Sequence, residues 1–193
     1  DGYSCAGGLT QEGKWYAAIR MADNNDEKYT EPGEDRWKIA LREQYGFADW
    51  MEQASLPRKL MWIEEGDRSA KLLSEAEMIF GPGSVKTDVP AGMATWCERK
   101  DETWHLMVKN EGSLLKLHSS HEKMAQPAGC LLNGMCYGAV CVEEEGTATI
   151  IIYREDGTRY FSTKGRRPIL CPAHNNIYLL YEQVRNDKSG ISL

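Results

Sequence analysis

One hairpin constrains the fold of this chain more than any other feature. Residues 147–153 and 159–164 are two alternating runs, and Asp156-Gly157 between them is a strong turn signal. A two-residue turn there predicts the cross-strand pairs Thr149–Lys164, Ile150–Thr163, Ile151–Ser162, Ile152–Phe161 and Tyr153–Tyr160. One face then mixes hydroxyl and apolar groups, whereas the other is more uniformly apolar. The chain therefore contains antiparallel β-structure with two unlike faces.

A second alternating run lies near the start of the chain, at residues 15–21. Gly13 permits a sharp turn into it. Trp15, Ala17, Ile19 and Met21 share one face, and a period of two over this length indicates a strand with one buried face. Trp15 has a large apolar ring that could pack at one end of a hydrophobic core, so this face is predicted to point inward.

Further short runs are typical of strands joined by polar turns. In 36–42, Trp37, Ile39 and Leu41 alternate with charged or small residues, which predicts a half-buried strand. Residues 69–80 suit either a strand or a short helix. The remaining predicted strands are 58–65, 93–99, 104–110 and 114–118. Several short strands at close spacing favour a barrel or sandwich, and no internal repeat or linker divides residues 1–193, so we expect one domain.

The C-terminal region follows a different period. Apolar residues recur at i, i+3, i+4 and i+7, as Ile177, Leu180, Tyr181 and Val184. This spacing predicts an amphipathic α-helix. An asparagine at 175 or 176 can cap its start, and Gly190 follows its end.

Charge and hydropathy exclude several functional classes. The 193 residues carry a net charge of −6 and have a pI of about 5.3. Binding to nucleic-acid phosphates or to an anionic membrane needs a basic face, so neither partner is expected. No apolar run approaches the ~18–20 residues that a membrane-spanning helix requires, so membrane insertion is not expected either.

Six cysteines, at positions 5, 97, 130, 136, 141 and 171, include no Cys-x-x-Cys pair. An even number scattered through a small acidic chain favours disulfides and an oxidising compartment. Fifteen pairings are possible and the sequence does not choose among them; buried free thiols are the alternative. We therefore expect a secreted, extracellular protein.

The order of these features resembles the lipocalin family, in its odorant-binding and urinary-protein branch. The resemblance covers about thirty consecutive positions from Gly13, where a Gly-x-Trp strand leads through an acidic loop into a second alternating strand. It returns at Gly165-Arg166, followed by Pro168, which is similar to the third lipocalin signature. Much of 47–141 departs from the family pattern, and the Thr-Asp-Tyr box is absent.

The resemblance implies a fold. It is an all-β, single up-and-down antiparallel barrel of about eight strands, with the C-terminal α-helix packed on the outside. The structural motif would comprise Gly13, Trp15, Gly165 and Arg166. In the family the matching arginine lies across the Gly-x-Trp indole, so Arg166 is expected to contact Trp15 at the closed end of the barrel.

A barrel of this size can hold a ligand or be filled by side chains. The mixed face of the hairpin suits a lumen, because a few polar groups can orient an apolar ligand. The apolar face, with Ile152, suits contact with the helix. The predicted ligand-binding residues are Trp37, Ile39, Leu41, Thr149, Ile151, Tyr153, Tyr160 and Ser162. The alternative is that these residues simply fill a solid core.

No catalytic pattern stands out. His118 and His121 lie three apart, which places them on opposite faces of a strand, so a metal site is not expected. His105 and His174 are isolated, and Ser119-Ser120 lacks a nucleophile elbow. The barrel thiol of prostaglandin-synthase lipocalins has no counterpart in the first two predicted strands. The sequence predicts no enzyme, no metal and no cofactor.

The predicted function is therefore that of a secreted carrier of a small, mainly hydrophobic molecule, for transport, storage or release. Odorants, pheromones, lipids and retinoids are the ligand classes that the resemblance implies. The alternative is a secreted interaction, defence or immunomodulatory protein whose loops bind a receptor, macromolecule or host mediator. A filled lumen together with an exposed apolar patch on the loops would favour this alternative.

Overall fold

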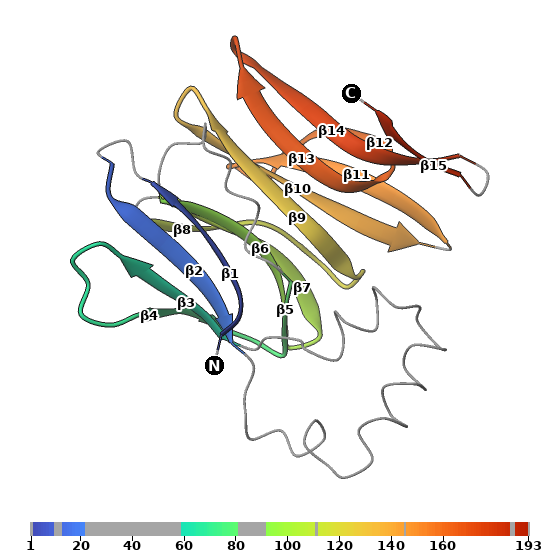
Figure 1. Ribbon diagram of the computed structural model, residues 1–193. Coiled ribbons are helices and arrows are strands. Elements are labelled where there is room, and N and C mark those ends of the chain that lie inside the picture. Colours follow the sequence, from blue (N-terminus) through green and yellow to red (C-terminus); the bar gives the residue numbers. More distant parts are fainter. Residues whose placement is uncertain are drawn as a thin grey trace.

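A computed structural model describes residues 2–9, 13–21, 59–80, 92–110, 112–144, 146–185 and 188–192, with side chains at 7–9 and from 13 to 183 within these ranges. The described residues form fifteen strands and no helix (Figure 1). None of them therefore belongs to a helix that could span a membrane.

The strands form four antiparallel sheets, each built from strands that are consecutive in the sequence. Sheet A contains β1 (Gly2–Leu9), β2 (Trp15–Met21), β3 (Lys59–Glu64) and β4 (Lys71–Glu75). Sheet B contains β5 (Met78–Phe80), β6 (Met93–Lys100), β7 (Thr103–Asn110) and β8 (Ser113–Ser120). Sheet C contains β9 (Met124–Leu132), β10 (Met135–Glu144), β11 (Thr147–Arg154) and β12 (Arg159–Lys164). Sheet D contains β13 (Arg166–Ala173), β14 (Asn176–Arg185) and β15 (Lys188–Ser192).

Three hydrophobic cores join the sheets face to face in the order A, B, C, D. The A/B core is formed by Tyr16, Ala18, Leu60, Trp62, Ile79, Ala94 and Trp96. The B/C core includes Phe80, Cys97, Trp104, Leu106, Val108, Leu117, Met124, Cys136, Val140, Val142 and Tyr153. The C/D core includes Ala128, Cys130, Tyr137, Ala139, Ile150, Ile152 and Leu170. Figure 1 shows this series in colour order, from blue and teal through green to orange and red.

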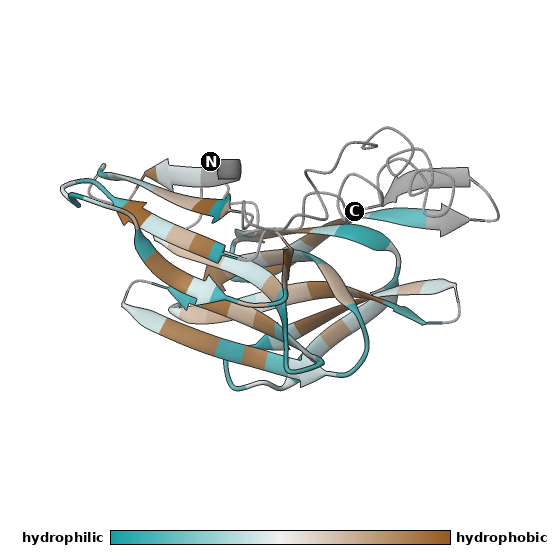
Figure 2. Cartoon of the chain, turned by 90° about the horizontal axis from the view of Figure 1, so that it is seen from below, coloured by the Kyte–Doolittle hydropathy of each residue, from teal (hydrophilic) through white to brown (hydrophobic). Residues whose placement is uncertain are grey.

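The two middle sheets are covered on both faces. Six consecutive residues of β6, from Met93 to Glu98, are buried, and so are seven consecutive residues of β10, from Cys136 to Val142. Strands buried on both faces have continuous runs of apolar or small residues, rather than an alternating pattern. Figure 2 shows brown hydrophobic segments on many of the strands, with paler and teal segments between them.

The predicted closed barrel is wrong. A barrel requires each strand to bond its neighbours around a complete ring. Here the hydrogen-bonded ladder stops after β4, β8 and β12, and the following strand opens a new sheet. The all-β class is correct, but four separate sheets replace the single barrel.

The predicted C-terminal helix is also wrong, because that segment is the strand β14. It pairs with β13 on one side and β15 on the other. Ile177, Leu179 and Tyr181 pack against the C/D core, as alternation on a strand requires. Ile152 was expected to pack under the predicted helix; it packs in the same core as Ile177, Leu179 and Tyr181, which belong to a strand instead.

The hairpin register is confirmed for four of the five predicted pairs. The pairs from Thr149–Lys164 to Ile152–Phe161 occur as expected, whereas Tyr153 pairs with Arg159 rather than Tyr160. The turn has three residues between Arg154 and Thr158, and Gly157 adopts a φ of 82°. A three-residue turn with a left-handed glycine brings a bulge with it, which accounts for the local shift.

Strand β2 has the predicted bounds but the opposite buried face. Tyr16 and Ala18 are buried against sheet B, whereas Trp15 is 45% exposed. Gly13 has a φ of 81°, in agreement with a sharp turn before the strand. The outer face of β2 is apolar too, so alternation between Trp15 and Tyr16 could not decide which of the two points inward.

Of the two interpretations of residues 69–80, the strand is correct and the helix is wrong. The segment contains two strands, β4 and β5, which belong to different sheets. No disulfide joins any two of the five cysteines whose side chains are described; the side chain of Cys5 lies outside the description. The expected disulfide framework is therefore not found in the described part of the chain.

Candidate functional site

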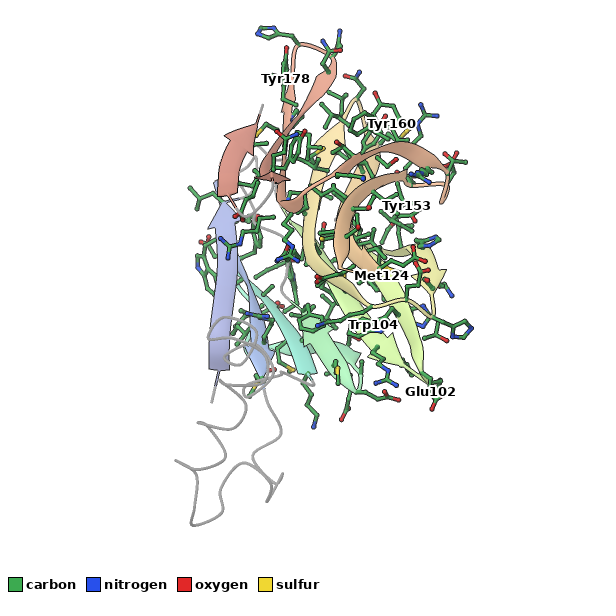
Figure 3. All side chains as sticks on the ribbon, turned by 90° about the vertical axis from the view of Figure 1, so that its right-hand side faces the viewer. Glu102, Trp104, Met124, Tyr153, Tyr160 and Tyr178 are labelled. Carbon is green, nitrogen blue, oxygen red and sulfur yellow. The ribbon has the colours of Figure 1, made fainter. Side chains whose placement is uncertain are left out.

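The predicted lumen residues of β11 lie between two packed sheets. Tyr153 is buried in the B/C core with Trp104 and Met124, and Ile151 packs against the same core (Figure 3). Thr149 pairs with Val142, another member of this core. The mixed face of the hairpin therefore packs against sheet B instead of lining a barrel lumen.

The two predicted site residues of β12 do not join this group. Tyr160 is 47% exposed; its ring meets Tyr137 edge-on at 5.4 Å, and the Arg154 guanidinium lies 4.9 Å from the ring centre. Ser162 accepts a hydrogen bond from Arg159. The other three predicted residues, Trp37, Ile39 and Leu41, lie outside the described residues.

The residues of the expected closed barrel end are in different sheets. Trp15 is on β2 of sheet A and Arg166 is on β13 of sheet D. The cation–π contacts found among the described residues do not include this pair; Arg166 instead donates to Glu143 at 2.7 Å. Gly165 is needed for close packing, because a Cβ atom there would lie 2.4 Å from the Tyr181 ring.

The outer face of sheet A is apolar across three strands. We call it the A face and define it as Trp15, Ala17, Ile19, Met21, Met61, Ile63 and Leu72. Ala17 pairs with Ile63, and Ile19 with Met61, so these side chains are cross-strand neighbours. Trp15 and Leu72 are the most exposed members, at 45% and 55%, and the other five are partly exposed.

Charged groups border the A face at both ends. At one end, Glu65 accepts a hydrogen bond from the Trp15 amide at 3.1 Å. At the other, Lys59 pairs with Met21 in the sheet and forms an ion pair of 3.5 Å with Glu75. An apolar centre with a charged rim is the usual anatomy of a protein-binding surface.

Beneath sheet A, the A/B core encloses a cation. The Lys109 Nζ atom lies 3.9 Å from the centre of the Trp62 ring and 3.6 Å from a Glu64 carboxylate oxygen, and donates to the Gly92 carbonyl. Trp62 donates to Glu64 at 2.5 Å and stacks on Tyr16. Burial raises the pKa of Tyr16 above its ordinary value. These mutual contacts satisfy the charges, so the cluster is structural.

A second set of polar residues forms a row across sheet B, on the side that faces sheet A. Glu98, His105 and Ser119 are paired in register on β6, β7 and β8. His105 Nδ1 lies 2.8 Å from Ser119 Oγ, and the buried Glu98 accepts hydrogen bonds from Trp96 Nε1 and Ser74 Oγ. Burial, and then the nearby Lys116 charge, lower the pKa of His105 below its ordinary value, although Glu98 opposes this.

The sequence did not identify this row because its members are separated along the chain. His105 looked isolated and Ser119 lacked a recognisable motif, and fourteen residues separate them. The register of β7 and β8 is what brings them together. That register depends on a bulge near Leu106, which no pattern in the sequence predicts.

The described residues contain no group of three or more His, Cys, Asp or Glu side chains arranged to hold a metal ion. Comparison with known families found no family model that matches the chain, and no curated protein matches it.

Proposed function

We propose that this protein is an interaction protein that binds another protein through the A face. The observation that supports this most directly is the apolar composition of an outer sheet surface that includes the exposed Trp15 and Leu72. Large apolar patches on a protein surface mark interaction sites, particularly where polar residues surround them.

The composition of the A face suits a small number of strong contacts. Tryptophan is among the residues that dominate binding energy, because its large ring loses much water-accessible area in one step. Leu72 and Met61 are cross-strand partners, and Met61 in turn pairs with Ile19. These aliphatic groups can surround the contact that Trp15 makes with the partner and exclude water from it.

The charged residues around the A face indicate what kind of surface the partner has. We expect a flat, aliphatic or aromatic protein surface bordered by charges of both signs, because Glu65 lies at one end of the A face and Lys59 with Glu75 at the other. Exposed pairs of this kind contribute little affinity but fix the orientation of the partner and the rate of association.

The A-face proposal takes the place of the carrier prediction. The carrier mechanism required a ligand cavity in a barrel, and Ile151 and Tyr153, its predicted lining, pack against sheet B instead. An interaction protein was expected to carry its exposed apolar patch on the loops, whereas the A face is an apolar patch on a sheet. Secretion remains part of the proposal and depends on the even number of cysteines, although no disulfide joins the five whose side chains are described.

Site-specific photo-crosslinking tests the proposal. A benzophenone amino acid replaces Leu72 on the A face or, as the matched control, Leu114 on sheet B, which is 52% exposed. Each purified protein is then irradiated in extracellular fluid from its source, and crosslinked products are resolved by mass. We expect a discrete product from position 72 and none at position 114.

Substitution identifies the contact. Trp15→Ser should reduce the product at position 72 at least tenfold, in a protein that circular dichroism shows to be folded. Identical products from both positions would contradict the proposal. So would a product made only of two copies of this chain, which would assign the face to self-association.

A further inference from the structure

We propose that Ser119 is a nucleophile, activated by His105 and assisted by Glu98, that attacks short-chain carboxylic esters. The three side chains lie on neighbouring strands of sheet B, in register, on the side that faces sheet A. This activity is separate from the proposed binding function, because none of the three residues belongs to the A face.

Cross-strand register places the groups at the required spacing. Directly paired residues in an antiparallel sheet have Cβ atoms roughly 4.5–5.5 Å apart, so Glu98–His105 and His105–Ser119 are adjacent pairs. The contact of 2.8 Å between His105 Nδ1 and Ser119 Oγ is a nucleophile–base hydrogen bond. Exposure increases along the row, from the buried Glu98 through a half-buried His105 to the exposed Ser119.

The charges of the row suit proton transfer from Ser119. The lowered pKa of His105 keeps its ring neutral near pH 7, and a neutral ring with its proton on Nε2 can accept the Ser119 proton at Nδ1. The Glu98 carboxylate favours the imidazolium that then forms. Hydrogen bonds from Trp96 and Ser74 hold this carboxylate in position.

Lys116 supplies a cation on the same strand as Ser119. It pairs with Met107, two residues along β7 from His105, and its charge lowers the pKa of His105. A positive charge beside the reacting carbonyl stabilises the negative charge that develops on the carbonyl oxygen. β8 is also an edge strand of sheet B, so an ester can reach Ser119 from the side on which β8 has no neighbouring strand.

The proposed reaction is an ordinary acyl transfer through an acyl-serine intermediate. Ser119 Oγ bonds to the ester carbonyl carbon while its proton passes to His105 Nδ1. The carbon–oxygen bond to the alcohol then breaks, and His105 returns the proton to the departing alcohol. Water then attacks the acyl-serine while it loses a proton to His105. The carbon–oxygen bond to Ser119 breaks, His105 returns the proton to Ser119 Oγ, and the carboxylic acid is released. The exposed position of Ser119 favours short acyl groups, which need no deep pocket.

Labelling of the purified full chain with a fluorophosphonate probe tests the proposal. Intact-mass analysis should show one adduct per chain, and peptide mapping should place it on Ser119. With p-nitrophenyl acetate, Ser119→Ala should abolish the acylation, because it removes the nucleophile. His105→Ala should lower the acylation rate about 100-fold, because general-base assistance contributes roughly that factor. Glu98→Gln retains the shape of the side chain and should lower the rate several-fold.

Ser120→Ala is the matched control. Ser120 is the next residue of β8 and accepts a hydrogen bond from the Glu122 amide, so its loss should leave the labelling rate within twofold of the unsubstituted protein. Circular dichroism verifies that each variant is folded. Absence of an adduct, an adduct on another residue, or full labelling of Ser119 in His105→Ala would overturn the proposal.

Discussion

Two glycines determine how closely sheets B and C approach. Gly129 and Gly138 face each other on β9 and β10. A Cβ atom at Gly129 would lie 2.0 Å from Thr95 Oγ1, and one at Gly138 would lie 2.5 Å from Leu117 Cδ1. Neighbouring side chains therefore occupy the space that larger residues would need. These glycines serve close packing, not a turn.

Gly129→Ala should destabilise the protein by about 1–3 kcal/mol, the usual cost of overpacking a core. Urea unfolding measures the change. Adding Thr95→Ala removes the hydroxyl that clashes and should recover part of the loss, so the two changes should not be additive. Gly112→Ala is the control, because nothing lies within 4 Å of a Cβ there. Equal effects at positions 112 and 129 would contradict the packing of sheet C on sheet B.

The buried Cys130 thiol is expected to lower the free energy of unfolding at alkaline pH. Burial, and to a lesser extent Cys171 and Cys136, raise its pKa to about 12 from an ordinary 9.0. Above pH 9 the unfolded chain loses this proton while the folded chain keeps it. The folded state then binds more protons, so the free energy of unfolding falls as the pH rises from about 9 to about 12.

Between pH 8 and pH 10 this thiol should lower the free energy of unfolding by about 1.4 kcal/mol, one pKa unit's worth of free energy. Cys130→Val removes the titrating group and should reduce the loss over this interval by that amount, as measured by urea unfolding at each pH. An identical pH dependence in both proteins would show that the thiol is already ionised or oxidised in the folded state.

At the scale of elements, β14 shows why local pattern can mislead. Ile177, Leu180, Tyr181 and Val184 have helical spacing, yet Ile177, Leu179 and Tyr181 also alternate. Both periods fit because position 179 and position 180 are both leucine. Pairing with β13 and β15 decides between them, and a single sequence does not report such long-range pairing.

Two adjacent alanine substitutions distinguish the strand from the helix. Leu179 packs against the C/D core, whereas Leu180 is on the opposite face of β14. Leu179→Ala should therefore cost about 2 kcal/mol of stability and Leu180→Ala less than about 1 kcal/mol, in chemical unfolding at one pH. A helix with the predicted apolar face would reverse this order.

The hairpin of β11 and β12 shows what the sequence could predict. Its turn is local, so the register of four pairs from Thr149 to Ile152 followed from Asp156-Gly157 alone. The sheet that packs on each face of the hairpin could not be predicted from the local sequence. Ile151 meets sheet B and Ile152 meets sheet D, and the sheets come from distant parts of the chain. The row of Glu98, His105 and Ser119 was missed for the same reason.

In the whole molecule, the position of a sheet in the series determines its composition. The middle strands β6 and β10 have long buried runs that include alanine and cysteine, and the run of β10 also includes a glycine. Continuous runs of this kind are typical of strands covered on both faces. β2, in sheet A, alternates between a face buried on sheet B and the partly exposed A face. The region that departed most from the lipocalin pattern includes these middle strands.

Native-state hydrogen exchange tests this series of sheets. Amides in β6 and β10 should exchange slowest, because opening either strand disrupts packing on both of its faces. β12, an edge strand with exposed residues at its start, and β4, an edge strand of sheet A, should exchange at least tenfold faster than β6 and β10. A closed barrel would protect these strands evenly, because it has no edges. Uniform protection across β4, β6, β10 and β12, measured by mass spectrometry of peptides that each cover one strand, would therefore favour a barrel over four stacked sheets.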